Sequence, residues 1–122
     1  MTAPILKKEA LLSAIENKGV VLLIRGTTAS VTQSGTRGES VDITAEVLEQ
    51  IQGKADKTIS LRRYTSKGDV VIAPGKLFVV AAIPNARFGT SFELLGHVVT
   101  DEKKQATSVV AHQAAIKKLQ SK

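Results

Sequence analysis

The stretch Leu77-Phe78-Val79-Val80-Ala81-Ala82-Ile83 is apolar at every position, with Pro74-Gly75 before it and Pro84-Asn85 after it. An uninterrupted apolar run of this length, bounded by turn residues and containing β-branched and aromatic side chains, predicts a strand. Because no polar residue alternates with the apolar ones, both faces of this strand are expected to be buried. The sequence therefore predicts a central strand that is covered on both sides.

Strand patterns occupy much of the chain around this run. Residues 58–64 alternate, so Ile59 and Leu61 are expected to face away from Arg62. Val20–Arg25 is mostly apolar and predicts another buried strand. Further strands are expected at residues 29–33, 39–43, 70–73 and 92–99. Glycine-containing turns are expected at residues 26–28, 34–38 and 66–69.

Three segments predict helices instead. Residues 5–17 combine an apolar face with a charged one. Thr44 has the hydroxyl of an N-cap, and the apolar residues after it predict a short middle helix that ends at Gly53. Residues 101–119 predict a C-terminal helix, with Asp101 or the threonine before it as the cap.

These elements predict one α+β domain over residues 1–122. The length of 122 residues fits a single domain, and the hydrophobic fraction of 43% is sufficient for one core. We expect a curved, mainly antiparallel sheet of six to seven strands. An N-terminal, a middle and a C-terminal helix are expected to pack against one side of it.

Several classes of site and location are excluded by composition. The chain has no cysteine, so it has no disulfide, thiolate metal site or cysteine nucleophile. No apolar run approaches the roughly 20 residues that a membrane-spanning helix needs. The N-terminus lacks the charged-then-apolar order of a secretory signal. We therefore expect a cytoplasmic protein, or one in the cytoplasm of an infected host if the gene is viral, with no membrane partner.

The positive charge is concentrated in the second half of the chain. Residues 1–61 hold seven Lys/Arg and seven Asp/Glu, whereas residues 62–122 hold ten Lys/Arg and four Asp/Glu. The whole formal charge of +6 therefore lies in residues 62–122. Such an asymmetry is typical of proteins that bind nucleic acid or another anionic surface. The same charge also serves solubility in ordinary small domains.

The first candidate site lies on the strand predicted at residues 58–64. Arg62, Arg63 and Tyr64 combine guanidinium groups for phosphate with an aromatic ring for base stacking. The alternative is a solvated sheet face on which the tyrosine covers the arginine stem.

Two further candidate sites lie in predicted turns. Lys67, Lys76 and Arg87 are expected in or beside hairpin turns, which would flank a groove if they project together. Arg37 lies in a loop with two glycines and several hydroxyls, a composition that suits a phosphate. That loop lacks the lysine-hydroxyl ending of a P-loop, so a simple hairpin loop is the alternative.

Catalysis and metal binding have little support in the sequence. His97 and His112 are the only histidines, and no carboxylate lies at zinc-ligand spacing from them. Both are expected to be packing residues. Glu93 and His97 are expected on one face of the last strand, but no nucleophile completes a triad. We therefore expect no enzyme activity, no cofactor and no metal.

The sequence predicts a small non-enzymatic protein that binds single-stranded DNA or RNA with weak sequence specificity. Single strands are favoured over duplex because no helix is basic along one face. The expected contacts are Arg62, Arg63, Lys67, Lys76, Arg87 and Arg37, with stacking by Tyr64. A homodimer is expected.

The alternative is a protein–protein assembly or regulatory subunit, viral or cellular, whose basic charge serves solubility. Its support is the low number of aromatic residues and the long apolar run Leu77–Ile83, which could lie at a subunit interface.

Overall fold

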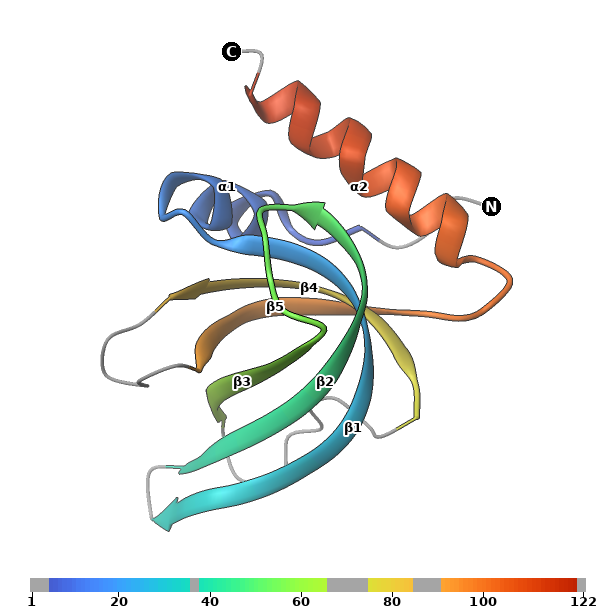
Figure 1. The fold of residues 1–122 in the computed structure, drawn as a ribbon. Helices are drawn as coiled ribbons and strands as arrows, with labels where there is room; N and C mark the ends of the chain where they lie inside the picture. Colours follow the sequence, from blue (N-terminus) through green and yellow to red (C-terminus); the bar gives the residue numbers. More distant parts are fainter. Residues whose placement is uncertain (1–4, 36–37, 66–74, 85–90, 121–122) are drawn as a thin grey trace.

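The computed structural model describes residues 5–35, 38–65, 75–84 and 91–120. Within these residues the chain forms two helices and five strands (Figure 1). In chain order they are α1 Lys8–Glu16, β1 Val20–Gly35, β2 Gly38–Gln52, β3 Thr58–Thr65, β4 Leu77–Pro84, β5 Phe92–Thr100 and α2 Gln105–Gln120. The α+β class is confirmed, whereas the prediction of six to seven strands and three helices is wrong.

The five strands close into a barrel in the order β1-β2-β3-β5-β4, with β4 returning to pair with β1. All neighbouring pairs are antiparallel except β3 and β5, which run parallel. The order β4-β1-β2-β3 is that of a Greek key, in which a fourth strand returns to lie beside the first. The curved, mainly antiparallel sheet is thus closed on itself.

The segment predicted as a turn at residues 26–28 lies inside one continuous strand. β1 runs from Val20 to Gly35 and pairs with β2 along this length. A register shift between Gly26 and Thr28 leaves one extra residue on β1, which is the mark of a bulge. A bulge bends and twists a strand without ending it, so one strand replaces the two that were expected.

The middle helix predicted from Thr44 to Gly53 is also wrong, because these residues extend β2. Ile43 and Ala45 are buried, and Val47 packs against the same cluster, which is the two-residue period of a strand. The local helix signal was overridden by pairing with β1 and β3. Gly53, with a φ of +77°, follows the last residue of this strand.

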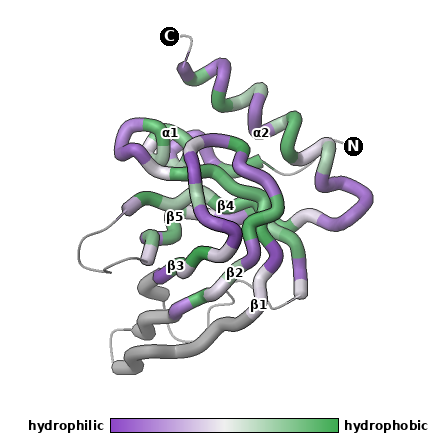
Figure 2. The backbone as a smooth tube through the Cα atoms, in the orientation of Figure 1, coloured by the Kyte–Doolittle hydropathy of each residue, from purple (hydrophilic) through white to green (hydrophobic). Residues whose placement is uncertain are grey.

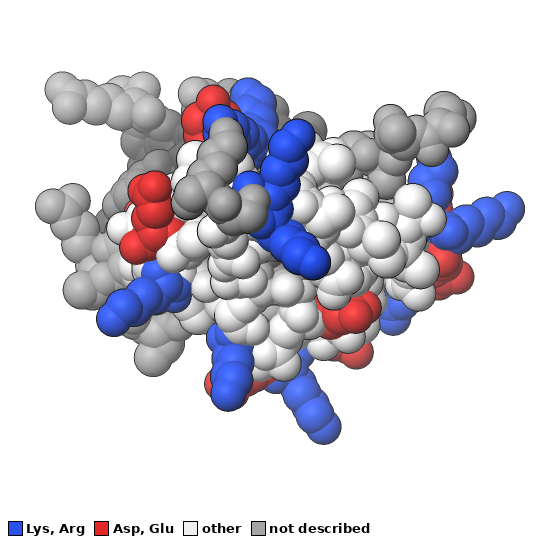
Figure 3. All heavy atoms as spheres, turned by 90° about the horizontal axis from the view of Figure 1, so that it is seen from above, with Lys and Arg blue, Asp and Glu red and all other residues white. Residues whose placement is uncertain are grey.

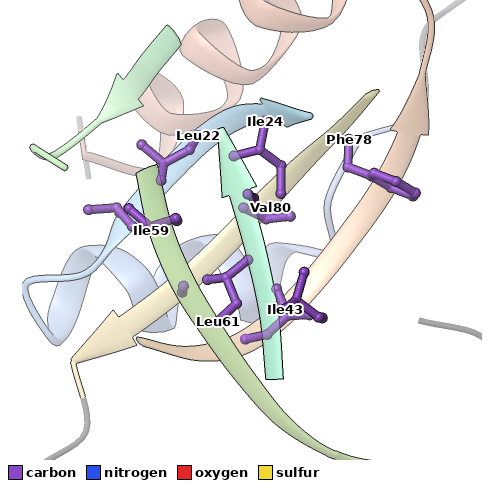
Figure 4. Close-up of a cluster of buried hydrophobic side chains, with 11 residues drawn as sticks. Leu22, Ile24, Ile43, Ile59, Leu61, Phe78 and Val80 are labelled. Carbon is purple, nitrogen blue, oxygen red and sulfur yellow. The ribbon is translucent and has the colours of Figure 1, made fainter. Parts of the chain in front are cut away.

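β4 confirms the expected strand with two buried faces. Its residues Leu77–Ala82 are all buried. Phe78, Val80 and Ala82 face the barrel interior (Figure 4). Val79 and Ala81 face outward into a second cluster with α1 and α2. Residues Val20–Ile24 of β1 alternate in the same way, which explains why the hydropathy of this part of β1 and of β4 is high (Figure 2).

Both helices lie on one side of the barrel, against β1 and β4 (Figure 1). This side is closed by Leu11 and Ala14 of α1, by Val109 and Ile116 of α2, and by Leu6 just before α1. The N-terminal helix expected at residues 5–17 is confirmed as the shorter α1. The C-terminal helix is confirmed as well, and the Asp101 carboxylate accepts hydrogen bonds from two backbone amides just before it.

β5 does not alternate along its whole length as expected. Leu94 pairs with Ala82 and Gly96 pairs with Ala81, so Leu95 is an extra residue in a bulge. A bulge of one residue exchanges the two faces of the strand. The register therefore puts His97 on the inner face, beside Phe78, and not on the face of Glu93.

Two expected elements, the turn at residues 66–69 and the strand at 70–73, fall outside the described residues. Among the helices that the structure does describe, none has the length and apolar character required to cross a membrane.

Candidate nucleic-acid interface

The outer face of β2 and β3 is the surface on which the first candidate site was expected. Leu61 is buried in the barrel interior, so its neighbour Arg62 projects outward, as predicted. The Arg62 side chain is 29% exposed. The helices pack over β1 and β4, and α2 also contacts β2, where Ile51 near the end of that strand joins their apolar cluster.

Arg62 forms a paired contact with Asp42 on the neighbouring strand. The two residues lie directly opposite each other in the β2–β3 ladder. Arg62 Nε donates to Asp42 Oδ1 at 2.6 Å, and Arg62 Nη2 donates to Oδ2 at 2.9 Å. This bidentate geometry is the strong form of an arginine–carboxylate pair. The hydrogen bond from Arg62 lowers the pKa of Asp42 below its ordinary value.

The rest of the described β2–β3 face is polar but not basic. Thr44 lies opposite Ser60, and Glu46 lies opposite Thr58. Together with the pair above, the described residues contribute two carboxylates and one guanidinium to this face. A basic sheet surface was expected here, and the described residues alone do not form one.

The remaining predicted contacts lie partly or wholly outside the described residues. Arg63 and Tyr64 belong to β3, where they pair with Val41 and Ser40, but their side chains are outside the described part of the structure. Three further predicted contacts lie entirely outside the described residues: Arg37, Lys67 and Arg87.

Arg37, Lys67 and Arg87 each belong to a segment that continues from the end of a described strand. These strand ends are neighbours in the barrel. Gly35 pairs with Gly38 at the end of the β1–β2 hairpin, and the next β2 residue pairs with Thr65 at the end of β3. Pro84 pairs with Phe92 where β4 ends and β5 begins, and Phe92 in turn pairs with Leu61 of β3. Four residues of β3, about 13 Å at the rise of a strand, separate Leu61 from Thr65.

Lys76 lies at the opposite end of β4 from the segment that contains Arg87. It directly precedes β4, whereas Arg87 follows the last residue of that strand, Pro84. β4 has seven residue steps between Leu77 and Pro84, which is about 23 Å. Lys67 and Arg87 lie outside the described residues, so the groove flanked by Lys67, Lys76 and Arg87 stays a prediction.

Lys76 instead lines the same hollow as two cations that the sequence analysis did not identify. With Arg25 of β1 and Lys104, just before α2, it lines a hollow of about 700 Å³. These three residues are far apart in the sequence, and only the barrel closure and the position of α2 bring them together. The one feature of the sequence that could have indicated this cluster is Arg25, which directly follows the apolar residues of β1.

The two histidines occupy packing positions, as predicted. His112 is fully buried, and its Nε2 accepts a hydrogen bond from the Leu6 amide at 3.1 Å. Its Nδ1 lies 2.7 Å from the Ser108 carbonyl oxygen, so Nδ1 carries the proton and donates. Burial lowers the pKa of His112. His97 packs edge-to-face on Phe78, with ring centroids 5.8 Å apart.

On the helix side of the molecule, Lys and Arg side chains project from several places and are interspersed with Asp and Glu (Figure 3). Comparison of the chain with known protein families, curated proteins and solved structures finds no match.

Proposed function

We propose that this protein is a small, non-enzymatic, cytoplasmic protein that binds single-stranded DNA or RNA. The ligand contacts the end of the barrel where the β1–β2 hairpin, the end of β3 and the β4–β5 connection start. Its backbone phosphates are neutralised by basic side chains from these segments. A homodimer of this chain would present two such surfaces.

The observation that supports this proposal is the gathering of three strand ends. The end of the β1–β2 hairpin is next to Thr65, and the β4–β5 junction pairs with β3 four residues earlier. The segments that continue from these ends contain Arg37, Lys67 and Arg87, and Arg63 precedes Thr65 on β3. Between them, residues 36–37, 66–74 and 85–90 contain one acid, Asp69.

The barrel architecture is compatible with this use. Five-stranded Greek-key barrels of the OB type bind oligonucleotides on the face of strands 2 and 3 and with the loops between strands 1 and 2 and strands 4 and 5. The strand order here permits the same use of β2, β3 and the two connections. This is an analogy between folds, so we infer the function from the basic residues themselves.

The role of Arg62 in this proposal differs from that of the other cations. Its charge is already balanced by Asp42, and two hydrogen bonds hold the guanidinium. A guanidinium plane held in this way is suited to stacking on a base more than to neutralising a phosphate. Phosphate contacts are therefore assigned to Arg37, Arg63, Lys67 and Arg87.

The rival function, a protein–protein assembly module, was supported by an apolar run and by the low number of aromatic residues. The apolar run Leu77–Ile83 was expected to suit a subunit interface. In the structure Leu77–Ala82 is buried between the barrel interior and the two helices. This run is therefore part of the internal packing of the molecule.

The test is fluorescence anisotropy with labelled single-stranded DNA, single-stranded RNA and duplex, at about 50 and 200 mM salt. The double variant Arg37→Gln/Arg63→Gln removes two proposed phosphate contacts. Its matched control is Lys8→Gln/Lys117→Gln, which removes the same charge from exposed positions on the two helices. We expect the site variant to flatten the salt dependence by roughly one unit of slope per lost contact, and the control to change it much less.

Two results would overturn the proposal. One is the absence of binding to any of the three probes at the lower salt concentration. The other is an equal loss of affinity in the site variant and the control, because that would make the attraction a property of net charge and not of this surface.

A further inference from the structure

A hollow separate from the proposed nucleic-acid surface lies where β4 begins and β5 ends. Its walls come from the end of the apolar part of β1, the residues that lead into β4, and the connection from β5 to α2. Across the barrel wall, Arg25 pairs with Leu77, and Leu77 pairs with Thr100. The hollow is thus built on three adjacent strands.

Backbone contacts fix the positions of two of its cationic residues. The Gly26 amide donates to the Lys76 carbonyl oxygen at 3.2 Å, and the Gly75 amide donates to the Gly26 carbonyl oxygen at 2.7 Å. These bonds hold Lys76 beside the strand that carries Arg25. On the opposite wall, Asp101 Oδ1 accepts hydrogen bonds from the amides of Lys103 and Lys104, each at 2.9 Å.

The cations of the hollow have no acidic partners in the described part of the chain. Arg25 is half-buried, and Lys76 and Lys104 are exposed. None of the three forms an ion pair or a side-chain hydrogen bond with another described residue. Two carboxylates, Asp101 and Glu102, also line the hollow, but Asp101 is engaged by the two amides. The described lining therefore has three cations and two carboxylates, a formal net charge of +1.

A buried hydroxyl in the same wall also lacks a partner. Thr100 lines the hollow and is only 7% exposed, and within the described residues its Oγ1 has no hydrogen-bond partner. Buried polar groups are rarely left without partners, because each one loses its hydrogen bonds to water on folding. The Oγ1 atom itself is closed off from solvent, so a ligand oxygen in the hollow would accept from this hydroxyl only after the side chain turns about χ1.

From these observations the geometry points to a binding site for a phosphate group, held by Arg25, Lys76 and Lys104 with Thr100. Arginine provides a fork of donors that matches two phosphate oxygens, and each lysine adds a point charge. A phosphate presents oxygens in several directions, which suits cations that come from three separate elements. This site does not rest on the proposed function, because it lies at the other end of β4 and β5.

The site is tested by NMR titration of the full chain with inorganic phosphate at constant ionic strength, with chloride as the compensating anion. We expect saturable shifts of the amide signals of Lys76, Leu77 and residues 100–104. The double variant Lys76→Gln/Lys104→Gln replaces exposed side chains, so it is expected to fold, and should weaken phosphate binding by about tenfold or more. The control Lys8→Gln/Lys117→Gln, of equal net charge, should retain the affinity of the unmodified chain.

A second variant, Thr100→Val, tests the hydroxyl. Valine has nearly the same shape, so a several-fold loss of phosphate affinity without loss of folding is expected if the hydroxyl contacts the ligand. A single-stranded oligonucleotide, used as the second probe, identifies the source of the phosphate. Shifts in the hollow with inorganic phosphate alone indicate a small phosphate-bearing ligand, and shifts with the oligonucleotide indicate a nucleic-acid backbone.

The proposal is overturned if neither probe shifts these signals, or if the hollow variant and the control respond alike. These outcomes are distinct from a failure of the proposed function. Arg37→Gln/Arg63→Gln should leave the titration with inorganic phosphate unchanged, whatever it does to oligonucleotide binding.

Discussion

Gly19 joins α1 to β1 at a point where the backbones of three segments meet. Its amide donates to the Ala14 carbonyl oxygen at 2.6 Å. A side chain at this position would clash with the Ala82 carbonyl oxygen of β4 and would lie 2.8 Å from the Ile83 side chain. Because the obstacle includes backbone, it cannot move aside without shifting a central strand.

The first prediction concerns this glycine. Gly19→Ala should lower the free energy of unfolding by about 1–3 kcal/mol, the range typical of overpacked positions. Gly96→Ala is the matched control, because its new Cβ would lie 3.4 Å from the Ala10 Cβ, close to ordinary contact. Urea unfolding measures both variants. Equal stability of the two would show that the approach of β4 to Gly19 is not close.

His112 links α2 to the segment before α1 while its imidazole is neutral. Its unprotonated Nε2 accepts from the Leu6 amide, and a proton on this nitrogen would remove the acceptor. Burial lowers the pKa of His112 in the folded state, so the unfolded chain takes up this proton at a higher pH than the folded chain does. Stability from this residue is therefore complete above the unfolded pKa, about 6.5.

The second prediction follows from this sign. As the pH falls below about 6.5, the free energy of unfolding should decrease, because the unfolded state binds more protons. Urea unfolding between pH 8 and pH 5 measures the effect, and His112→Gln should have a shallower pH dependence over this interval. A stability that rises as the pH falls through this interval in the unmodified chain would contradict the buried, neutral imidazole.

At the scale of elements, α2 stabilises the fold through one of its faces. Val109, His112 and Ile116 are buried against the barrel and α1, whereas Val110 is 63% exposed. The spacing of the buried residues is that of a helix with one packed side. Removal of side-chain atoms from the two faces should therefore have unequal effects.

The third prediction compares two truncations on this helix. Ile116→Ala should cost about 2–5 kcal/mol in the free energy of unfolding, the range found for buried isoleucine and leucine. Val110→Ala is the control, with a change within about 0.5 kcal/mol because its side chain is already in water. Denaturant unfolding of both variants measures the two losses in the free energy of unfolding. Similar losses would mean that α2 does not pack as described.

At the scale of the whole molecule, the barrel has one short junction. Among the described residues, β3 and β5 pair only at Leu61 with Phe92 and at Arg62 with Glu93, whereas β1 and β4 pair at six positions. The short junction is also the parallel one, and parallel pairing is slightly less stable per residue. Local opening should start where the fewest pairs must separate.

The fourth prediction is a gradient of amide hydrogen exchange. Amides that point across the β3–β5 junction should exchange about tenfold or more faster than amides between β1 and β4. Exchange measured by NMR under native conditions gives the rates residue by residue. Equal protection of both junctions would indicate a barrel that opens only by global unfolding.

The sequence predicted those elements whose buried residues can be recognised within a short stretch of the chain. The apolar runs of β1 and β4, the outward position of Arg62 and both terminal helices agree with the structure. Each depends on a period that is visible within ten to twenty residues. The candidate residues Arg63, Tyr64, Lys67, Arg87 and Arg37 remain predictions.

The alternating apolar residues and the charge asymmetry of this chain follow from its sequence alone, because they are local or additive properties. Only the tertiary structure decided that Thr44–Gln52 extends β2 and that Asp42 forms an ion pair with Arg62. It also decided that Lys76 lines one hollow with Arg25 and Lys104. Each of these depends on which strands become neighbours when the barrel closes. That choice minimises the exposure of apolar surface over the whole chain, and no window of neighbouring residues contains it.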